Sequence, residues 1–329
     1  APGILGGGSM SATAYAEFLG AEYLSSYLPA GGGSVKVAVA GDADVAARFE
    51  RGLQGAAELH NCLMVSLTAE ATRVHMVDQV FFTVARQLDW DLIAAAIVRG
   101  AYNEIAIPPG ADSLRVSDVA AAHGLDPREL YRSVRRRLEQ TLLLDTRLPR
   151  MLRRALLRLA QWQLGAGDVD ATEARVVRGW LIGEKVPLRE LREQRIYARV
   201  GRHNARGLLA AVGECVQRAD RGGVVIYFDL SRLAVVHRPP REERTGVYYT
   251  KASTLDAYEL VRQLIDAIDE LAGMLVVAVI PPELVSDERR GLPAYAALQL
   301  RVADEVRDRR RPNPFAALVR LDVRLEAVR

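Results

Sequence analysis

Apolar positions along the first ninety residues predict two alternating strand–helix units. From Ser11 to Leu28 they recur at helical spacing, and the glycine run at 31–33 ends this first helix. The elements expected after it are a strand at 35–40 (VKVAVA), a helix at 45–59, a strand at 63–67 (LMVSL) and a helix at 74–88. Consecutive strand–helix units place their strands parallel in one sheet, with the helices packed on its faces.

The pattern changes between residues 89 and 220, where strand signals almost vanish and helical periodicity dominates. Sheet character returns at Gly222. The elements expected there are a strand at 223–228 (GVVIYF), a helix at 255–271, a strand at 274–280 (MLVVAVI), a helix at 294–308 and a short apolar segment at 317–325. These patterns predict an α/β fold with a parallel sheet flanked by helices and a large inserted all-helical subdomain.

Length and composition refine this organisation of the 329-residue chain. We expect a tag or disordered tail at 1–10, the first part of the sheet domain at 11–90, the helical subdomain at 91–220 and the second part of the sheet domain at 221–329. The tail lacks the basic start and long apolar stretch of a signal peptide, and the sequence suggests no transmembrane helix. The net charge of +3 is too small to indicate nucleic acid by itself. Cys62 and Cys215 are expected as buried free thiols, and the expected location is the cytoplasm.

The sheet half has its parts in the order of a P-loop NTPase. A strand leads into a turn at Gly41 and a helix, a later apolar strand ends at Asp229, and a third strand follows at 274–280. In such enzymes a GxxxxGK(S/T) loop wraps the phosphates with backbone N–H groups, its lysine reaches the terminal phosphates, and its Ser or Thr binds magnesium. The acidic residue after the later strand holds the magnesium shell. The layout therefore predicts a P-loop-like fold.

The residues that hydrolysis requires are missing from these positions. Ala46, Ala47 and Arg48 stand where Gly, Lys and Ser/Thr are needed. Asp42 and Asp44 bring negative charge to the phosphate site, which opposes the binding of a triphosphate. A leucine follows the later strand's aspartate, where an ATPase usually has its water-activating glutamate. The two retained positions also have a purely structural interpretation, as a turn glycine and as a carboxylate that caps a turn.

Five segments in a fixed order carry a family resemblance. They are RELYRSVRRRL (128–138), RGWLIGEKVPLRELREQRIY (178–197), GGVVIYFDLSRL (222–233), AYELVRQLIDAID (257–269) and PPELVSDERRGLPAYAALQLR (281–301). Through this series the chain from about residue 116 onward resembles the P-loop ATP-binding proteins of BREX-type phage-defence loci. The resemblance implies a GK(S/T) loop at 41–48 and an Asp-Glu pair at 229–230, and the sequence departs from both. It carries over Gly41 and Asp229, with Arg289, Arg290 and Arg301 as phosphate or interface arginines.

Arginines gather in the helical half. Residues 119–131 (VAAAHGLDPRELY) are typical of a helix, a glycine turn and a second helix opened by an Asp-Pro pair. The second helix and the amphipathic helix at 147–164 present basic faces that suit a phosphate backbone or an acidic partner. The candidate contact residues are Arg132, Arg135, Arg136, Arg153 and Arg154. A helical hairpin with solvated faces is the alternative interpretation.

The sequence as a whole favours a pseudo-ATPase, a P-loop-like scaffold or interaction module that could also sense a nucleotide or another small ligand. ATP hydrolysis is not expected. ATP or another nucleotide is the one cofactor considered, and a protein partner is expected, with nucleic acid and an oligomer left open. The alternative is a DNA-binding regulator or phage-defence component that uses the arginine-rich helices. The candidate nucleotide-site residues are Gly41, Asp42, Asp229 and Arg301. No histidine spacing or nucleophile elbow predicts a metal site or a hydrolase triad.

Overall fold

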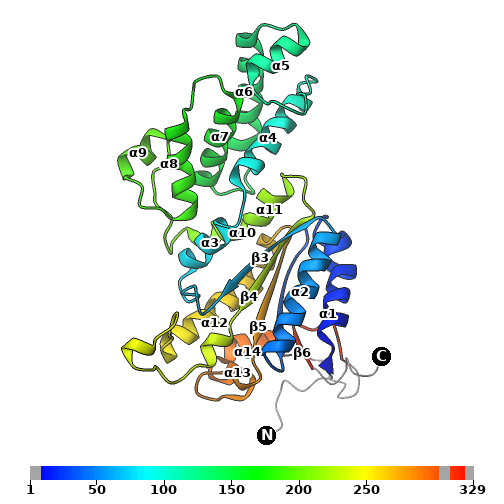
Figure 1. Ribbon diagram of the computed structural model, residues 1–329, viewed down its shortest axis with the longest axis vertical. Helices are drawn as coiled ribbons and strands as arrows, with labels where there is room; N and C mark the ends of the chain where they lie inside the picture. Colours follow the sequence, from blue (N-terminus) through cyan, green and yellow to red (C-terminus); the bar gives the residue numbers. More distant parts are fainter. Residues whose placement is uncertain (1–8, 304–311, 323–329) are drawn as a thin grey trace. The chain divides into compact units, whose positions relative to one another are not determined.

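The computed structural model describes residues 9–303 and 312–322, which fall into two compact units. One unit takes residues from both parts of the chain, up to Val80 and from Arg221 onward, and the other is Phe81–Asp220. The first unit holds the sheet and the helices on its faces, and the second is built of helices (Figure 1).

The sheet has six strands in the order β1-β6-β2-β5-β4-β3, and every neighbouring pair runs parallel. The strands are β1 (Ser9–Met10), β2 (Gly33–Ala40), β3 (Cys62–Thr68), β4 (Gly223–Asp229), β5 (Met274–Ile280) and β6 (Leu318–Leu321). This arrangement confirms the predicted α/β fold with a parallel sheet flanked by helices. Strand β5 lies between β2 and β4, so the carboxyl ends of these three strands adjoin one another at one edge.

The sheet unit is stabilised by apolar burial on both faces of its central strands. All positions of β2 and β5 are buried, as expected for strands covered by helices on either side. The helices of this unit are α1 (Ala12–Leu19) with its π-helical continuation η1 (Gly20–Tyr27), α2 (Ala43–Leu59), α12 (Lys251–Asp266), α13 (Glu283–Ser286) and α14 (Ala296–Val302). On one face Tyr15 and Phe49 stack at 5.5 Å between ring centroids, over the buried side chains of Val225 and Val277.

Within Phe81–Asp220 the regular structure is helical. Its helices are α4 (Trp90–Glu104), α5 (Val116–His123), α6 (Pro127–Leu143), α7 (Arg150–Leu164), α8 (Ala171–Ile182), α9 (Leu188–Glu193), α10 (Ala205–Ala210) and α11 (Val212–Gln217). Helices α4, α6 and α7 pack together around buried leucines such as Leu138 and Leu156. Helix α6 begins where the sequence places an Asp-Pro pair, because the Asp126 carboxylate accepts hydrogen bonds from the N–H groups of Arg128 and Glu129.

The ends of the chain differ from the sequence expectation. Ser9 and Met10 belong to the predicted tail but form β1, because their backbone pairs with Arg320 and Leu321 of β6. The rest of that tail, residues 1–8, lies outside the described residues, as do 304–308 of the predicted helix at 294–308 and 323–325 of the last apolar segment.

The helix expected at 74–88 is also shorter, and the division between the units falls within it. Helix α3 spans Val77–Ala85, and the residues before it form a turn in which the N–H of Met76 donates to the carbonyl of Arg73 (2.9 Å) and the N–H of Val74 donates to the Tyr249 hydroxyl (3.2 Å). The units divide after Val80, whereas the change of pattern along the sequence predicted a boundary at residue 90. Phe82 explains the earlier division, since its ring packs against Gly183 of the helical unit. Among the described residues, no helix combines the length and apolar character that crossing a membrane requires.

Candidate functional site

A cavity of about 660 Å³ opens at the carboxyl ends of β2, β4 and β5. Ligands of open parallel sheets bind at this edge, where the strands end and the following helices begin. The cavity is lined by the start of α2, the end of β4 and the segments after β4 and β5. Its lining residues are Ala40, Gly41, Asp42, Ala43, Ala46, Ala47, Glu50, Tyr227, Asp229, Ser231, Ala234, Val235, Val279, Ile280, Pro281, Pro282 and Glu283. Three of the four predicted nucleotide-site residues therefore lie together in one cavity.

The connection between β2 and α2 is too short to form a phosphate-wrapping loop. Strand β2 ends at Ala40 and α2 begins at Ala43, so Gly41 and Asp42 make the whole turn. The side chain of Asp42 caps the helix, and its Oδ1 accepts a hydrogen bond from the N–H of Val45 at 2.8 Å. The N–H of Gly41 donates to the carbonyl of Leu321 at 3.2 Å. These N–H groups therefore face protein oxygens, and a carboxylate sits where a helix N-terminus would otherwise attract an anion.

The positions aligned with the missing Gly-Lys-Ser/Thr lie inside α2 rather than in a loop. Ala46 and Ala47 line the cavity as small apolar side chains, and Arg48 is not among the lining residues. Helix α2 begins at Ala43, so the backbone at these three positions is already helical.

Asp229 combines a position on the cavity with a local structural role. Its Oδ1 accepts a hydrogen bond from the N–H of Ser231 at 2.8 Å, which fixes the turn after β4. The next residue, Leu230, is 1 % exposed, and its N–H donates to the carbonyl of Val279 at 2.8 Å. A side chain at position 230 therefore points into the core, away from the water that a catalytic glutamate would activate.

The cavity is acidic. Four carboxylates line it, from Asp42, Glu50, Asp229 and Glu283, and its lining includes no lysine, arginine or histidine. The Tyr227 hydroxyl donates to the carbonyl of Ala46 at 3.2 Å. Burial raises the pKa of Tyr227, and the charges of Glu50 and Asp229 raise it further. A triphosphate entering this cavity would meet like charge from several sides.

Glu50, Tyr227 and Glu283 also line this cavity, and no sequence pattern predicts them there. Glu50 lies a full two turns into α2, and Glu283 follows the Pro-Pro pair after β5, so neither belongs to a recognisable motif. The residue type of Asp42 is a signal for its capping role, because Asp is a preferred N-cap residue, but the helix expected at 45–59 places Asp44 at that position. Within the described parts of the chain, no group of three or more His, Cys, Asp or Glu side chains is arranged to hold a metal ion.

None of the three predicted phosphate arginines, Arg289, Arg290 and Arg301, lines the cavity, and Arg290 and Arg301 are held by other partners. Arg301 of α14 forms a two-pronged ion pair with Asp266 of α12, with 2.9 Å between Nη2 and Oδ2, and does not line the cavity. Arg290 is buried, and its Nη2 donates to the carbonyl of Tyr249 at 2.6 Å. Both arginines thus act as internal ties of the sheet unit.

Two of the five candidate arginines of the helical unit form ion pairs or hydrogen bonds within the protein. Arg135 pairs with Glu139 and Asp168, each at 3.0 Å, and Arg153 donates to the carbonyl of Leu143 at 2.6 Å. The remaining three candidates are the exposed Arg132 and Arg136 on α6 and the half-buried Arg154, which lines a small hollow together with Arg135. The predicted basic surface is therefore smaller than the arginine count suggests.

The fold and cavity define an α/β protein with a six-stranded parallel sheet flanked by helices and an acidic cavity at the carboxyl ends of its central strands. Residues 115–326 match the model of the family described as BREX system ATP-binding protein BrxC/D. This match covers more than half of the chain, so the protein belongs to that family, as the sequence resemblance indicated. The matched range includes Asp229, whereas the β2–α2 connection precedes it. The searches of curated proteins and of solved structures returned no significant match.

Proposed function

We propose that this BREX-family protein is a pseudo-ATPase, a P-loop-like scaffold that serves a phage-defence complex without hydrolysing ATP. The observation that carries the proposal is the two-residue β2–α2 connection, in which Asp42 caps the helix where a phosphate would bind. Loss of the Walker lysine removes the cation that would reach the terminal phosphates. The acidic lining of the cavity adds a repulsive field.

The same cavity suits a protein partner better than a nucleotide. Its carboxylates surround apolar side chains such as Ala46, Val235 and Val279. A lysine or arginine side chain of a partner would bury its aliphatic stem against these apolar groups and pair its charged end with the carboxylates. We therefore assign to the cavity the binding of a basic side chain of a protein partner. If the protein acts instead as a sensor of a small ligand, the same cavity would bind a small cation.

Magnesium-dependent ATP turnover tests the proposal. We expect no hydrolysis above background in the purified protein, and the same trace rate in Asp229→Ala, because the chain supplies neither the lysine nor the glutamate of the reaction. Calorimetric titration with ATP and GTP, with and without magnesium, measures separately whether the protein binds either nucleotide. Turnover that requires magnesium and disappears in Asp229→Ala would contradict the proposal.

A second candidate function, DNA binding, rests on a row of exposed arginines on α6. Arg128, Arg132 and Arg136 follow one another at intervals of four residues, so they lie along one face of the helix. Within the described part of the chain, none of the three has an ion pair with a carboxylate. We propose that Phe81–Asp220 is a subdomain inserted into the sheet unit and that this face is its contact surface for a phosphate backbone.

Binding to a short DNA duplex at increasing salt concentration tests this candidate. The binding constant K falls as salt rises, and each phosphate contact makes the slope of log K against log salt more negative by about 0.9. The double variant Arg132→Gln, Arg136→Gln should therefore reduce the steepness of this slope by about 2. Arg175→Gln is the matched control, because this exposed arginine lies on α8 of the same unit. An unchanged slope, or no binding at low salt, would remove the DNA hypothesis and leave the scaffold proposal untouched.

A further inference from the structure

A second hollow in the sheet unit has the opposite charge. Its volume is about 430 Å³, and the residues that line it follow β3 and β4 in the chain. Three arginines contribute to the lining, namely Arg73, Arg238 and Arg244, together with His75. The lining contains no Asp or Glu residue. The hollow therefore concentrates positive charge in a concave space, which is the electrostatic requirement for binding an anion.

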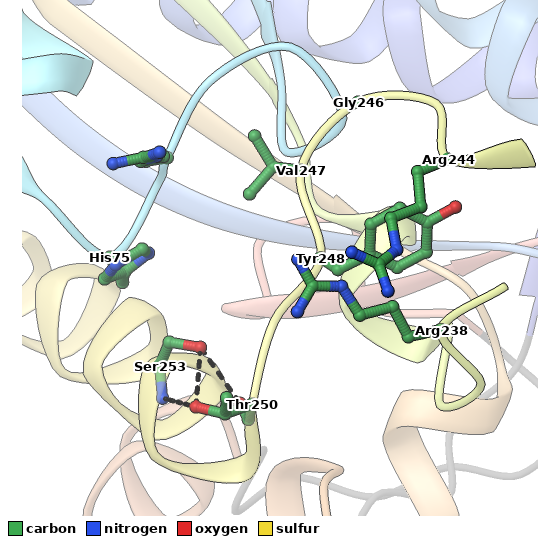
Figure 2. A pocket seen from close by; sticks show the side chains of 9 residues that line it. His75, Arg238, Arg244, Gly246, Val247, Tyr248, Thr250 and Ser253 are labelled. Atoms are coloured by element: carbon green, nitrogen blue, oxygen red, sulfur yellow. Dashed lines mark hydrogen bonds between the residues drawn. The ribbon is translucent and has the colours of Figure 1, made fainter. Parts of the chain in front are cut away.

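The arginines of this pocket are available to a ligand. Arg73 and Arg238 are exposed, and neither forms an ion pair with a carboxylate of the described residues. Arg244 uses its Nε to donate to the carbonyl of Pro239 at 3.1 Å, which leaves its terminal nitrogens for other acceptors. Figure 2 shows the side chains of Arg238 and Arg244 extending beside the Tyr248 ring, with His75 across the pocket from them.

The two segments that supply these side chains are tied firmly to each other. The Tyr249 hydroxyl lies 2.8 Å from the carbonyl of Ala69 and 2.6 Å from that of Thr72, and the N–H of Val247 donates to the carbonyl of Glu70 at 2.8 Å. These bonds hold the segment after β3 against the segment before α12. The backbone beside Arg73 is thus held against the segment that leads into α12 before a ligand arrives, which lowers the ordering cost of binding.

The aromatic wall of the pocket is fixed in the same way. The Arg232 guanidinium lies 4.3 Å from the centre of the Tyr248 ring and donates through Nε to the carbonyl of Val247 at 2.9 Å. Arg238 lies 6.0 Å from the same ring centre. Arg232 also pairs with Glu70 at 3.6 Å, so its charge is balanced outside the lining. The ring is thus held by Arg232, and it lies beside Arg238 without neutralising the charge of that arginine.

The opening turn of α12 contributes to the same space. Thr250 caps this helix, and Thr250 and Ser253 both line the pocket (Figure 2). The two hydroxyl groups lie 3.1 Å from each other within this cap, and the positive end of the helix adjoins the space that the arginines surround. The main features of the proposed site are the three guanidinium groups and the cavity, and the end of helix α12 contributes in addition.

We propose that this pocket binds the phosphate group of a phosphorylated small molecule, such as a nucleotide. Guanidinium groups bind phosphate oxygens with paired hydrogen bonds, and three of them reach this space, Arg73 from the segment after β3 and Arg238 and Arg244 from the segment after β4. Groups that converge on a concave space suit one compact phosphate, whereas a nucleic-acid backbone needs basic residues spaced along a track. The volume is within the range of small-molecule sites.

Calorimetric titration of the full chain with inorganic phosphate, pyrophosphate and ADP, without magnesium and at low salt, tests the proposal. We expect binding that the double variant Arg73→Gln, Arg238→Gln weakens at least about tenfold, because each substitution removes charge-assisted hydrogen bonds. Arg51→Gln is the matched control, since Arg51 is exposed on α2 and does not line the pocket. This control should change the dissociation constant by less than about twofold, as is usual for a charge outside the site.

Two further arms distinguish phosphate binding in this pocket from binding in the acidic cavity and from binding to a nucleic-acid surface. Asp42→Ala and Asp229→Ala should leave phosphate binding unchanged, because both residues line the acidic cavity. Binding that depends on these aspartates and not on the arginines would overturn the assignment, and so would the absence of binding at millimolar phosphate and ADP. An oligonucleotide that binds through Arg73 and Arg238 when phosphate, pyrophosphate and ADP do not would also overturn it, by showing a nucleic-acid surface.

Discussion

Lys36 is a charged side chain inside the sheet unit. It lies on β2 with 4 % of its surface exposed, and its Nζ donates to the carbonyls of Phe315 (2.6 Å) and Ala316 (3.2 Å). The ring of Tyr23 lies below the charge, with its centre 5.1 Å from Nζ. Burial lowers the pKa of Lys36 from 10.5 to about 8. The lysine thus ties the segment before β6 to β2, at the cost of desolvating a cation.

This environment predicts a specific dependence of stability on pH. The unfolded chain binds more protons than the folded chain between pH 8 and 10.5, so the free energy of unfolding rises with pH in that window. The free energy of unfolding of the wild type should therefore rise, relative to that of Lys36→Met, by up to about 3 kcal/mol between pH 8 and pH 10.5. Urea denaturation of both proteins from pH 7.5 to pH 10 measures the difference. Lys251→Met, at an exposed position, is the control, and parallel profiles for wild type and Lys36→Met would refute the prediction.

Among the elements, the β2–α2 connection shows what a sequence pattern can and cannot predict. Both elements were predicted, because an apolar run and a helical period are local signals. Their exact junction was not, since the helix begins at Ala43 rather than at residue 45, and this small difference leaves no room for a phosphate loop. Element boundaries depend on a single cap, here the hydrogen bond from Val45 to Asp42, which periodicity does not register.

Interactions between distant elements could not be predicted from the sequence, for a different reason. The insertion of β5 between β2 and β4 is a pairing choice that no local pattern encodes. Arg301 appeared as a phosphate arginine because its partner, Asp266, belongs to another helix. The basic pocket escaped detection as well, since Arg73 and Arg238 follow different strands and meet only through the parallel sheet.

At the scale of the whole molecule, the sheet unit separates two kinds of charge. The cavity beside β2 is lined by carboxylates, and the pocket formed by the segments after β3 and β4 is lined by arginines. Under our two proposals, phosphate is disfavoured at the carboxyl ends of β2, β4 and β5 and favoured in the arginine-lined pocket of the same unit. A scaffold of this kind would recognise an anion without an ATPase site.

The division into two units predicts two separable unfolding events. Each unit has its own buried core, and all three tryptophans, Trp90, Trp162 and Trp180, belong to Phe81–Asp220, so tryptophan fluorescence reports on the helical unit alone. Leu156→Ala leaves a cavity in that unit and should cost it about 2–5 kcal/mol, which lowers the midpoint of the fluorescence transition in urea. Leu275→Ala, an equally buried leucine on β5, should leave that midpoint in place and shift only part of the circular dichroism transition. If both variants shift fluorescence and circular dichroism together, the chain unfolds as one cooperative body and its helical part does not behave as an independent subdomain.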